Sequence, residues 1–307
     1  MVQKSALQSA MEYLMTYGWA ILIIAVVLGA LFQLGIFNAS TFTPKAPPGA
    51  CHIFRPNGPM TTSFINTQGI CNGELPQYVS AVNGQGYINI GSSSNLDVQS
   101  GVTVSAWVYA RSFGTNQYRT IAGRLSGANT DGCAFQYGLS SAWGSGNQFE
   151  FWAHKVGSTD CSYLSYVISG TTIVLGTWYN VIGTYDSVTG NQYVYVNGAG
   201  TLANKGAGVL IRSFPSEPLN IGRNPQNLWF FDGEIANVQI YNTSLSANEV
   251  SALYNEGIGG APVKLNNLVG WWPLNGDAKD YSGNNNNGAA TTGVSFTSSW
   301  VSGYSAP

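Results

Sequence analysis

Short runs of residues that alternate in character, separated by turn-forming residues, dominate this sequence from about Tyr78 to its end. In residues 101–109 (GVTVSAWVY), small apolar residues at even positions alternate with Thr, Ser, Trp and Tyr at odd positions. This period of two is typical of a strand in a packed sheet. The runs 178–186, 192–196 and 235–241 behave alike. Because such runs recur roughly every 8–12 residues without helices between them, the pattern favours a β-sandwich or jelly roll over a parallel α/β sheet.

Two local motifs predict where the chain turns and where it forms a helix. Asn197-Gly198 follows one strand-like run and predicts a tight hairpin, because both central residues of such a turn need positive φ. Ser246 and Glu249 have the spacing of a capping box, and Gly257 provides a stop for the helix that follows. The sequence therefore predicts one short helix among the strands.

Charge is scarce in this chain. Of its 307 residues, 8% are charged and 13% are aromatic, whereas about a quarter of an average protein is charged. The net charge of −2 leaves no basic surface for nucleic acid, which is therefore not an expected partner. The plentiful apolar residues exclude a disordered chain. A surface hydrated by uncharged Asn, Ser, Thr, Gln and Gly rather than by charged residues is typical of β-rich proteins outside the cytosol.

A long apolar stretch precedes the β region. From Tyr13 to Phe37 no side chain is charged. A helix over this stretch would be about 37 Å long, which is enough to cross a hydrocarbon layer about 30 Å thick. We therefore expect one long hydrophobic N-terminal α-helix. Lys4 ahead of it favours an N-terminus inside the cell and a large domain outside, by the positive-inside rule.

The polar residues before this helix, with Gln8-Ser-Ala-Met-Glu12-Tyr-Leu at the junction, resemble the class III signal peptide of archaeal pilins and archaellins. Leu7 departs from the small residue usual in that family. The resemblance implies that a prepilin peptidase cuts before Gln8, which becomes the mature N-terminus. It also implies that Glu12 neutralises the terminal ammonium of a neighbouring identical or related subunit in a filament. The alternative is a plain membrane anchor, with Glu12 in the headgroup layer.

The chain then divides into three predicted parts. Residues 1–38 are the leader and helix, residues 39–50 are a stiff Pro/Ser/Thr linker, and residues 51–307 form the β-sandwich. Asn38 and Asn242 each open an Asn-X-Ser/Thr triplet and are candidate N-glycosylation sites, although such triplets also occur by chance.

The four cysteines predict disulfides in an oxidising compartment. Three pairings are open. We favour Cys51–Cys71, which would clip a short Pro/Gly-rich loop, and Cys133–Cys161, which would join neighbouring strands. The alternative is four buried free thiols. No C-x-x-C motif occurs and His52 and His154 are far apart in sequence, so a zinc site is not expected.

The order of the strand-like runs resembles that of the concanavalin A-like, laminin-G-like jelly-roll family. The resemblance covers about residues 78–300 and rests on these segments in family order: 82–90, 104–108, 177–186, 194–198, 219–222 and 231–241. It implies a jelly-roll β-sandwich. Residues 268–276 (LVGWWPLNG) resemble the segment that usually opens such domains, yet they lie near the end of the chain. Because residues 268–307 are too apolar for a free tail, we favour a circularly permuted sandwich over a repeat cut short.

The resemblance includes laminarinase-like glycoside hydrolases, which need two carboxylates facing each other across a cleft. The Glu-x-Asp-x-x-Glu strand of that family is absent, and Asp232 with Glu234 is the nearest acidic pair. No Ser/His/Asp set or phosphate-binding Gly-Lys motif is suggested either. We therefore do not expect an enzyme.

Many relatives of this fold bind sugars or protein surfaces, often beside Ca²⁺. The loop that contains Asp277, Asp280 and Asn284 offers the oxygen ligands that calcium prefers, and calcium is the one cofactor considered. Ala236 stands where the family often adds an Asp ligand, and the alternative is an Asx-rich turn that satisfies its own backbone. Candidates for stacking on sugar rings, each of which is alternatively a core residue, are Trp143, Trp152, Tyr163 and Trp229.

The sequence therefore predicts a membrane-inserted precursor that becomes a subunit of an archaeal type IV pilus-like surface filament. Its exposed laminin-G-like domain would serve adhesion or carbohydrate binding, with a surface carbohydrate or protein as partner. The alternative is a membrane-anchored surface lectin or receptor that does not polymerise. An exported glycoside hydrolase is the third and least favoured interpretation.

Overall fold

The computed structural model describes residues 17–29, 51–54, 66–69, 79–112, 118–125, 135–142, 147–156, 166–224 and 229–297. The chain separates into two compact units, Met1–Lys45 and Ala46–Pro307. Several predicted positions lie outside the described residues, so the predictions that rest on them stay predictions. They are Gln8, Glu12, Asn38, the linker over residues 39–50, Cys71, Cys133, Cys161, Trp143 and Tyr163.

The first unit contains a helix over residues 17–29, within the stretch where a long helix is predicted. The other positions of the predicted Tyr13–Phe37 helix lie outside the described residues. No helix in the described part of the chain combines the length and apolar character that a membrane crossing requires. The large apolar side chains of the helix are nevertheless exposed, with Trp19 at 66% and Ile23 at 58%.

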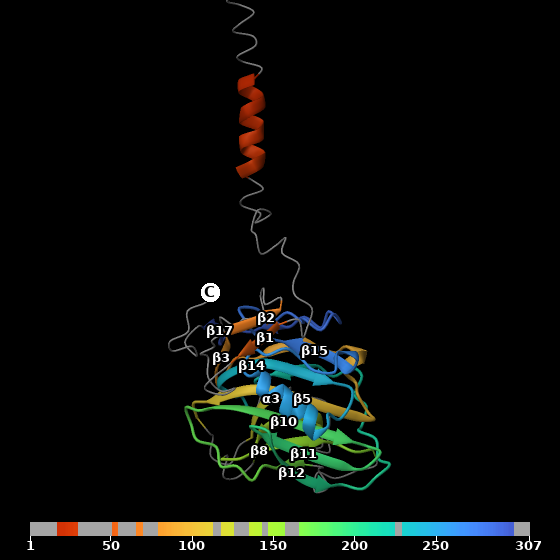
Figure 1. Ribbon diagram of the computed structural model, residues 1–307. Coiled ribbons are helices and arrows are strands. Elements are labelled where there is room, and N and C mark those ends of the chain that lie inside the picture. Colours follow the sequence, from red (N-terminus) through yellow and green to blue (C-terminus); the bar gives the residue numbers. More distant parts are fainter. Residues whose placement is uncertain are drawn as a thin grey trace, which may run out of the picture. The chain divides into compact units, whose positions relative to one another are not determined.

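The second unit is a sandwich of two antiparallel sheets, as the spacing of the strand-like runs predicts. The eight-stranded sheet has the order β12-β11-β10-β5-β14-β3-β17, with β15 also paired to β14. Figure 1 shows this succession from β17 to β12, with the helix α3 (Ala247–Glu256) lying across it. The strands are β3 (Val79–Asn83), β5 (Gly101–Ala110), β10 (Trp178–Asp186), β11 (Asn191–Val196), β12 (Ala199–Asn204), β14 (Asp232–Tyr241), β15 (Leu268–Trp272) and β17 (Val294–Thr297).

The seven-stranded sheet has the order β16-β4-β13-β6-β7-β8-β9. Its strands are β4 (Ile88–Gly91), β6 (Arg119–Leu125), β7 (Phe135–Ser141), β8 (Phe149–Ala153), β9 (Tyr166–Ile168), β13 (Leu219–Ile221) and β16 (Ala289–Ala290). A separate hairpin pairs β1 (Cys51–Phe54) with β2 (Asn66–Gly69), and short 3₁₀ turns cover Ser94–Leu96 and Leu265–Asn267.

Side-chain alternation along the strands builds the core between the sheets. The four small apolar residues of β5, from Val102 to Val108, point into it. Trp107, on the other face of β5, packs instead with Ala236 and Ile258, and Tyr254 of α3 packs against this cluster. The alternation predicted from residues 101–109 is therefore confirmed, and both faces of the strand are buried.

Both predicted local motifs are confirmed. Asn197 and Gly198 have φ of 51° and 80° and connect β11 to β12. Ser246 caps α3 by accepting from the backbone N–H of Glu249, whose side chain accepts from the backbone of Ser246 in return. Gly257, with φ of 79°, follows the helix end.

The C-terminal region 268–297 contributes strands to both sheets. β15 pairs with β14, β17 with β3, and β16 with β4. One edge of β14 serves two neighbours, because Asp232–Ile235 pair with β3 whereas Val238–Tyr241 pair with β15. The circular permutation itself stays a prediction.

Asn237 lies where β14 changes neighbours. Its φ is 50°, and the register of β14 against β5 shifts there. The buried side chain donates to the Gly260 carbonyl at 2.8 Å and accepts from Trp271 Nε1 at 2.7 Å and from Gln239 Nε2 at 3.1 Å. Because these bonds join three separate segments, Asn237 fixes β15 and the loop after α3 against the sheet.

Candidate functional site

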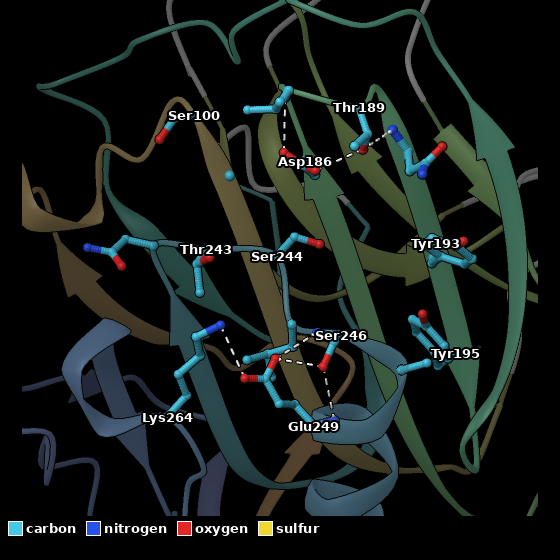
Figure 2. A pocket seen from close by; sticks show the side chains of 16 residues that line it. Ser100, Asp186, Thr189, Tyr193, Tyr195, Thr243, Ser244, Ser246, Glu249 and Lys264 are labelled. Carbon is cyan, nitrogen blue, oxygen red and sulfur yellow. Dashed lines mark hydrogen bonds and ion pairs between the residues drawn. The ribbon is translucent and has the colours of Figure 1, made fainter.

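A groove of about 570 Å³ lies on the outer face of the eight-stranded sheet, and Figure 2 shows it from close by. One wall comes from the β10–β11 hairpin and the other from the segment that leads into α3. Lys264, after α3, and Ser100, before β5, complete the lining. Two of the predicted strand runs and the capping box thus come together at one place, although sequence reasoning did not assign a ligand-binding site there.

Two tyrosines of β11 provide the aromatic surface of the groove. Val194 and Val196 point into the core, so Tyr193 and Tyr195 share the opposite face of the strand. Their rings are stacked, with centroids 5.3 Å apart and planes at 22°. Tyr195 is 6% exposed because it packs beside α3, whereas Tyr193 is half-buried. Tyr193 therefore offers the groove a ring that is already held in place by its neighbour.

The turn between β10 and β11 supplies polar groups at one end of the groove. Asp186 Oδ1 accepts from the backbone N–H of Val188 at 2.9 Å, and its Oδ2 accepts from Thr189 Oγ1 at 2.8 Å. Asn191 follows in the lining, and its Oδ1 accepts from Asn204 Nδ2 at 2.8 Å. The carboxylate is thus oriented by its own turn, and each of its oxygens has capacity for a further hydrogen bond.

The N-terminus of α3 forms the other polar wall. Glu249 Oε2 accepts from the backbone N–H of Ser246 at 2.8 Å and from its hydroxyl at 2.9 Å. Glu249 Oε1 is paired with Lys264 Nζ at 3.1 Å. Burial opposes the charged form of Glu249, but the bonds from Ser246 and Lys264 outweigh it and lower the pKa of the carboxyl below its ordinary value. Glu249 therefore stays ionised.

Asn242, a predicted glycosylation site, also lines the groove together with Thr243 and Ser244. It is exposed, and its Oδ1 accepts from Asn267 Nδ2 at 2.8 Å. The glycosylation stays a prediction.

This arrangement suits a flat ligand with apolar faces and a polar edge. An aromatic ring offers its face to C–H groups, while hydroxyl, amide and carboxylate groups around it fix the orientation of a ligand. A sugar ring has both kinds of surface.

The outer face of the seven-stranded sheet holds a second aromatic cluster. Tyr118 lies between two predicted stacking residues, with its ring centroid 5.1 Å from Trp152 and 4.8 Å from Trp229. Tyr166 contacts Trp152 from the other side at 5.4 Å. Trp152 is 2% exposed, so this candidate is a packed residue. Trp229 is half-buried and has φ of 57°, which is unusual for a bulky residue.

A buried carboxyl group lies beneath this cluster. Glu150 is 2% exposed, and its Oε1 accepts from Ser140 Oγ at 2.8 Å. The same hydroxyl accepts from Trp152 Nε1 at 2.8 Å. Burial raises the pKa of Glu150 to about 8. Burial, with smaller contributions from Glu150 and Tyr166, also raises the pKa of Tyr118 to about 12. Trp152 and Glu150 are therefore buried, and Glu150 is mainly protonated at neutral pH, whereas Tyr166 and Trp229 remain partly exposed.

One predicted calcium ligand, Asp280, is engaged by the backbone of its own loop and of β15. Its carboxylate accepts from the backbone N–H groups of Trp271, Ser282 and Asn286 at 2.9–3.0 Å. Three such bonds are typical of an aspartate that organises a turn. Asp280 thus holds the loop against the start of the C-terminal region.

The other two predicted calcium ligands are also engaged in turns. Asp277 accepts from the backbone N–H of Lys279 and from the Tyr281 hydroxyl, and Asn284 Nδ2 donates to two carbonyls of β15. Within the described ranges, no three His, Cys, Asp or Glu residues group as a metal site. These bonds are those of an Asx-rich turn, and calcium stays a prediction.

The acidic pair considered for hydrolysis lies on β14. Asp232 accepts from Ser112 Oγ at 2.6 Å and from Arg111 Nε at 3.4 Å. Glu234 lies 4.0 Å from Arg111 Nη1. Burial raises the pKa of Glu234 despite the opposing charge of Arg111. One arginine thus contacts both carboxylates.

Comparison with known proteins identifies the fold. A model of the concanavalin A-like lectin/glucanases superfamily matches residues 82–251. The native heptameric SAP-like pentraxin from Limulus polyphemus is similar with a TM-score of 0.50 and 16% identity, over 72% of this chain and 94% of the pentraxin chain. A putative carbohydrate binding protein from Bacteroides ovatus is similar with a TM-score of 0.50 and 18% identity, over 72% of this chain and 60% of that one.

At these identities the likeness to solved structures shows the fold alone. No curated protein sequence matches the chain. Since the family model covers more than half of the 307 residues, the chain belongs to the concanavalin A-like lectin/glucanases superfamily.

Proposed function

We propose that this protein binds carbohydrate in the groove beside Tyr193 and acts as the adhesive part of a cell-surface filament. The observation that carries the proposal is the half-buried Tyr193 ring, stacked on Tyr195 and surrounded by oriented polar groups of the Asp186 turn and the α3 N-terminus. Membership of a lectin and glucanase superfamily supports it. The Bacteroides ovatus protein shares this fold and is described as a putative carbohydrate binding protein, which is consistent with the same role.

Binding is proposed without hydrolysis. A glycosidase needs a carboxylic acid with a raised pKa as proton donor, across from a second carboxylate. Asp186 and Glu249 are the acidic residues of the groove lining. Burial opposes the ionisation of Glu249, but Ser246 and Lys264 outweigh it and lower the pKa of the carboxyl, which is the reverse of what a proton donor needs. Oligosaccharides incubated with the protein should therefore be recovered intact.

The N-terminal helix supports the proposed attachment. Its large apolar side chains, from Tyr17 to Leu28, are each about half exposed or more in the single chain. Apolar surface of this extent is stabilised when other apolar groups cover it. We propose that helices of like subunits cover it in a filament, after a prepilin peptidase has exposed Gln8. A membrane-anchored lectin that does not polymerise is the alternative.

Glycan binding by the full-length protein tests the groove. Tyr193→Ala should weaken binding about fivefold, because one stacked ring contributes about 1 kcal/mol. Tyr166→Ala is the matched control, since Tyr166 is 40% exposed and lies outside the groove lining. Equal binding by the wild type and Tyr193→Ala would contradict the proposed site. Added chelator tests the calcium prediction, which unchanged binding would remove.

The mature N-terminus and the assembly state test the attachment. Filaments sheared from cells should contain subunits that begin at Gln8, as read by intact-mass analysis. Glu12→Ala should abolish filaments without unfolding the sandwich. An intact Met1 in the membrane fraction, with no filaments, would favour the anchored lectin instead.

A further inference from the structure

We infer that the groove selects uncharged carbohydrates and disfavours glycans that carry carboxylate, sulfate or phosphate groups. The inference rests on the proposed carbohydrate binding. Two observations carry it. The one cation of the groove lining, Lys264, is already paired with Glu249, and the second carboxylate, Asp186, has no cationic partner among the lining residues.

The groove lining has an unbalanced charge. It contains one basic residue, Lys264, and two acidic residues, Asp186 and Glu249, and every lining residue belongs to the described part of the chain. Lys264 Nζ lies 3.1 Å from Glu249 Oε1. Two negative charges and one positive charge leave the lining with a net charge of −1. An anionic ligand would therefore meet a cation that is already neutralised.

The capping box prevents an easy exchange of partners. Glu249 Oε2 accepts from both the backbone N–H and the hydroxyl of Ser246, so the carboxylate is held at the start of α3. A ligand anion that attracted Lys264 away would still face the charge of Glu249. Repulsion between the ligand anion and the nearby Glu249 carboxylate disfavours this exchange of partners.

Asp186 suits the hydroxyl groups of a neutral sugar. Val188 N–H and Thr189 Oγ1 each occupy one of its oxygens and fix the direction of the carboxylate. The remaining acceptor sites match O–H donors. An acidic group on the ligand would lack this donor and would repel Asp186.

The probe is a panel of neutral hexose oligosaccharides, together with the C6-oxidised uronic-acid counterpart of the best binder. Full-length protein should bind the neutral member about tenfold more tightly than the oxidised member at low salt. Raising the salt concentration should narrow this ratio, because exposed charges are screened.

Two variants test the charges separately. Glu249→Gln should lower the ratio of the affinities for the neutral and oxidised oligosaccharides about fivefold. Gln maintains a capping box at this position, while Lys264 becomes available to an anion. Asp186→Asn should also lower this ratio, because the amide oxygen still accepts from Val188 N–H but carries no charge. Glu217→Gln removes the same charge outside the groove lining and should leave the ratio within about twofold.

The outcomes separate the inference from the function on which it rests. Equal wild-type binding of the neutral and oxidised members, or an unchanged ratio in Glu249→Gln, would overturn the selectivity and leave carbohydrate binding standing. Absence of binding to every member of the panel would overturn the proposed function itself.

Discussion

On the outer face of the eight-stranded sheet, Tyr193 is half-buried beside an open groove, whereas on the outer face of the seven-stranded sheet Trp152 is 2% exposed. Their carboxyl groups differ in the same way. Glu249 is paired with Lys264, while Glu150 is buried against Ser140 and its pKa is raised to about 8 by burial. An aromatic residue with a nearby acid is therefore a candidate for ligand binding only where the ring and the charge remain accessible.

The largest expected difference between the two faces is in stability. Trp152→Ala removes a ring packed between Tyr118 and Tyr166, and should lower the free energy of unfolding by about 3–5 kcal/mol. Tyr193→Ala removes a half-buried ring and should cost less, about 1 kcal/mol. Urea unfolding of both variants measures the difference. Similar losses would mean that the groove ring is also a core residue.

Glu150 should make the stability of the folded protein depend on pH. Its pKa rises from an ordinary 4.5 to about 8 on burial, so the folded state retains a proton that the unfolded chain releases. The stabilisation is complete below about pH 4.5 and is lost as the pH rises toward about 8. By pH 7 the loss is on the order of 3 kcal/mol.

Glu150→Gln is the variant that isolates this effect. The amide cannot ionise, so unfolding free energies measured between about pH 5 and pH 8 should vary less than in the wild type. Glu249→Gln, in the groove on the outer face of the eight-stranded sheet, is the control. Its unfolding free energy should change with pH as steeply as that of the wild type. A wild type whose stability rises over this range would contradict the assigned burial of Glu150.

A smaller loss of stability than that expected from Glu150 concerns the polar contacts of Asn237. Asn237→Ala leaves Trp271 Nε1 and the Gly260 carbonyl without their partner, at a cost of about 2 kcal/mol. The groove should become less ordered, because the loop after α3 carries Lys264. Thermal unfolding measures the cost, and glycan binding in the same variant should weaken. Wild-type binding in a destabilised Asn237→Ala protein would show that the groove is independent of this contact.

Sequence patterns predicted much of the sandwich because each signal was local. The alternation in 101–109, the turn at Asn197-Gly198 and the capping box at Ser246 each depend on neighbours within a few residues. These local signals did not show which of the two outer sheet faces leaves an aromatic side chain accessible. Trp152 and Tyr193 both lie on strands with their rings opposite the core, yet only one is covered.

Local sequence was sufficient for the class of fold, the hairpin and the helix start, because backbone conformation and side-chain period are set by adjacent residues. Long-range packing selected which aromatic residues face solvent, where Lys264 meets Glu249, and how Asn237 joins β14 to β15. Those outcomes depend on contacts between residues far apart in the chain. The periodicity of a short segment carries no information about contacts between distant residues, and it is these contacts that decide burial and charge pairing.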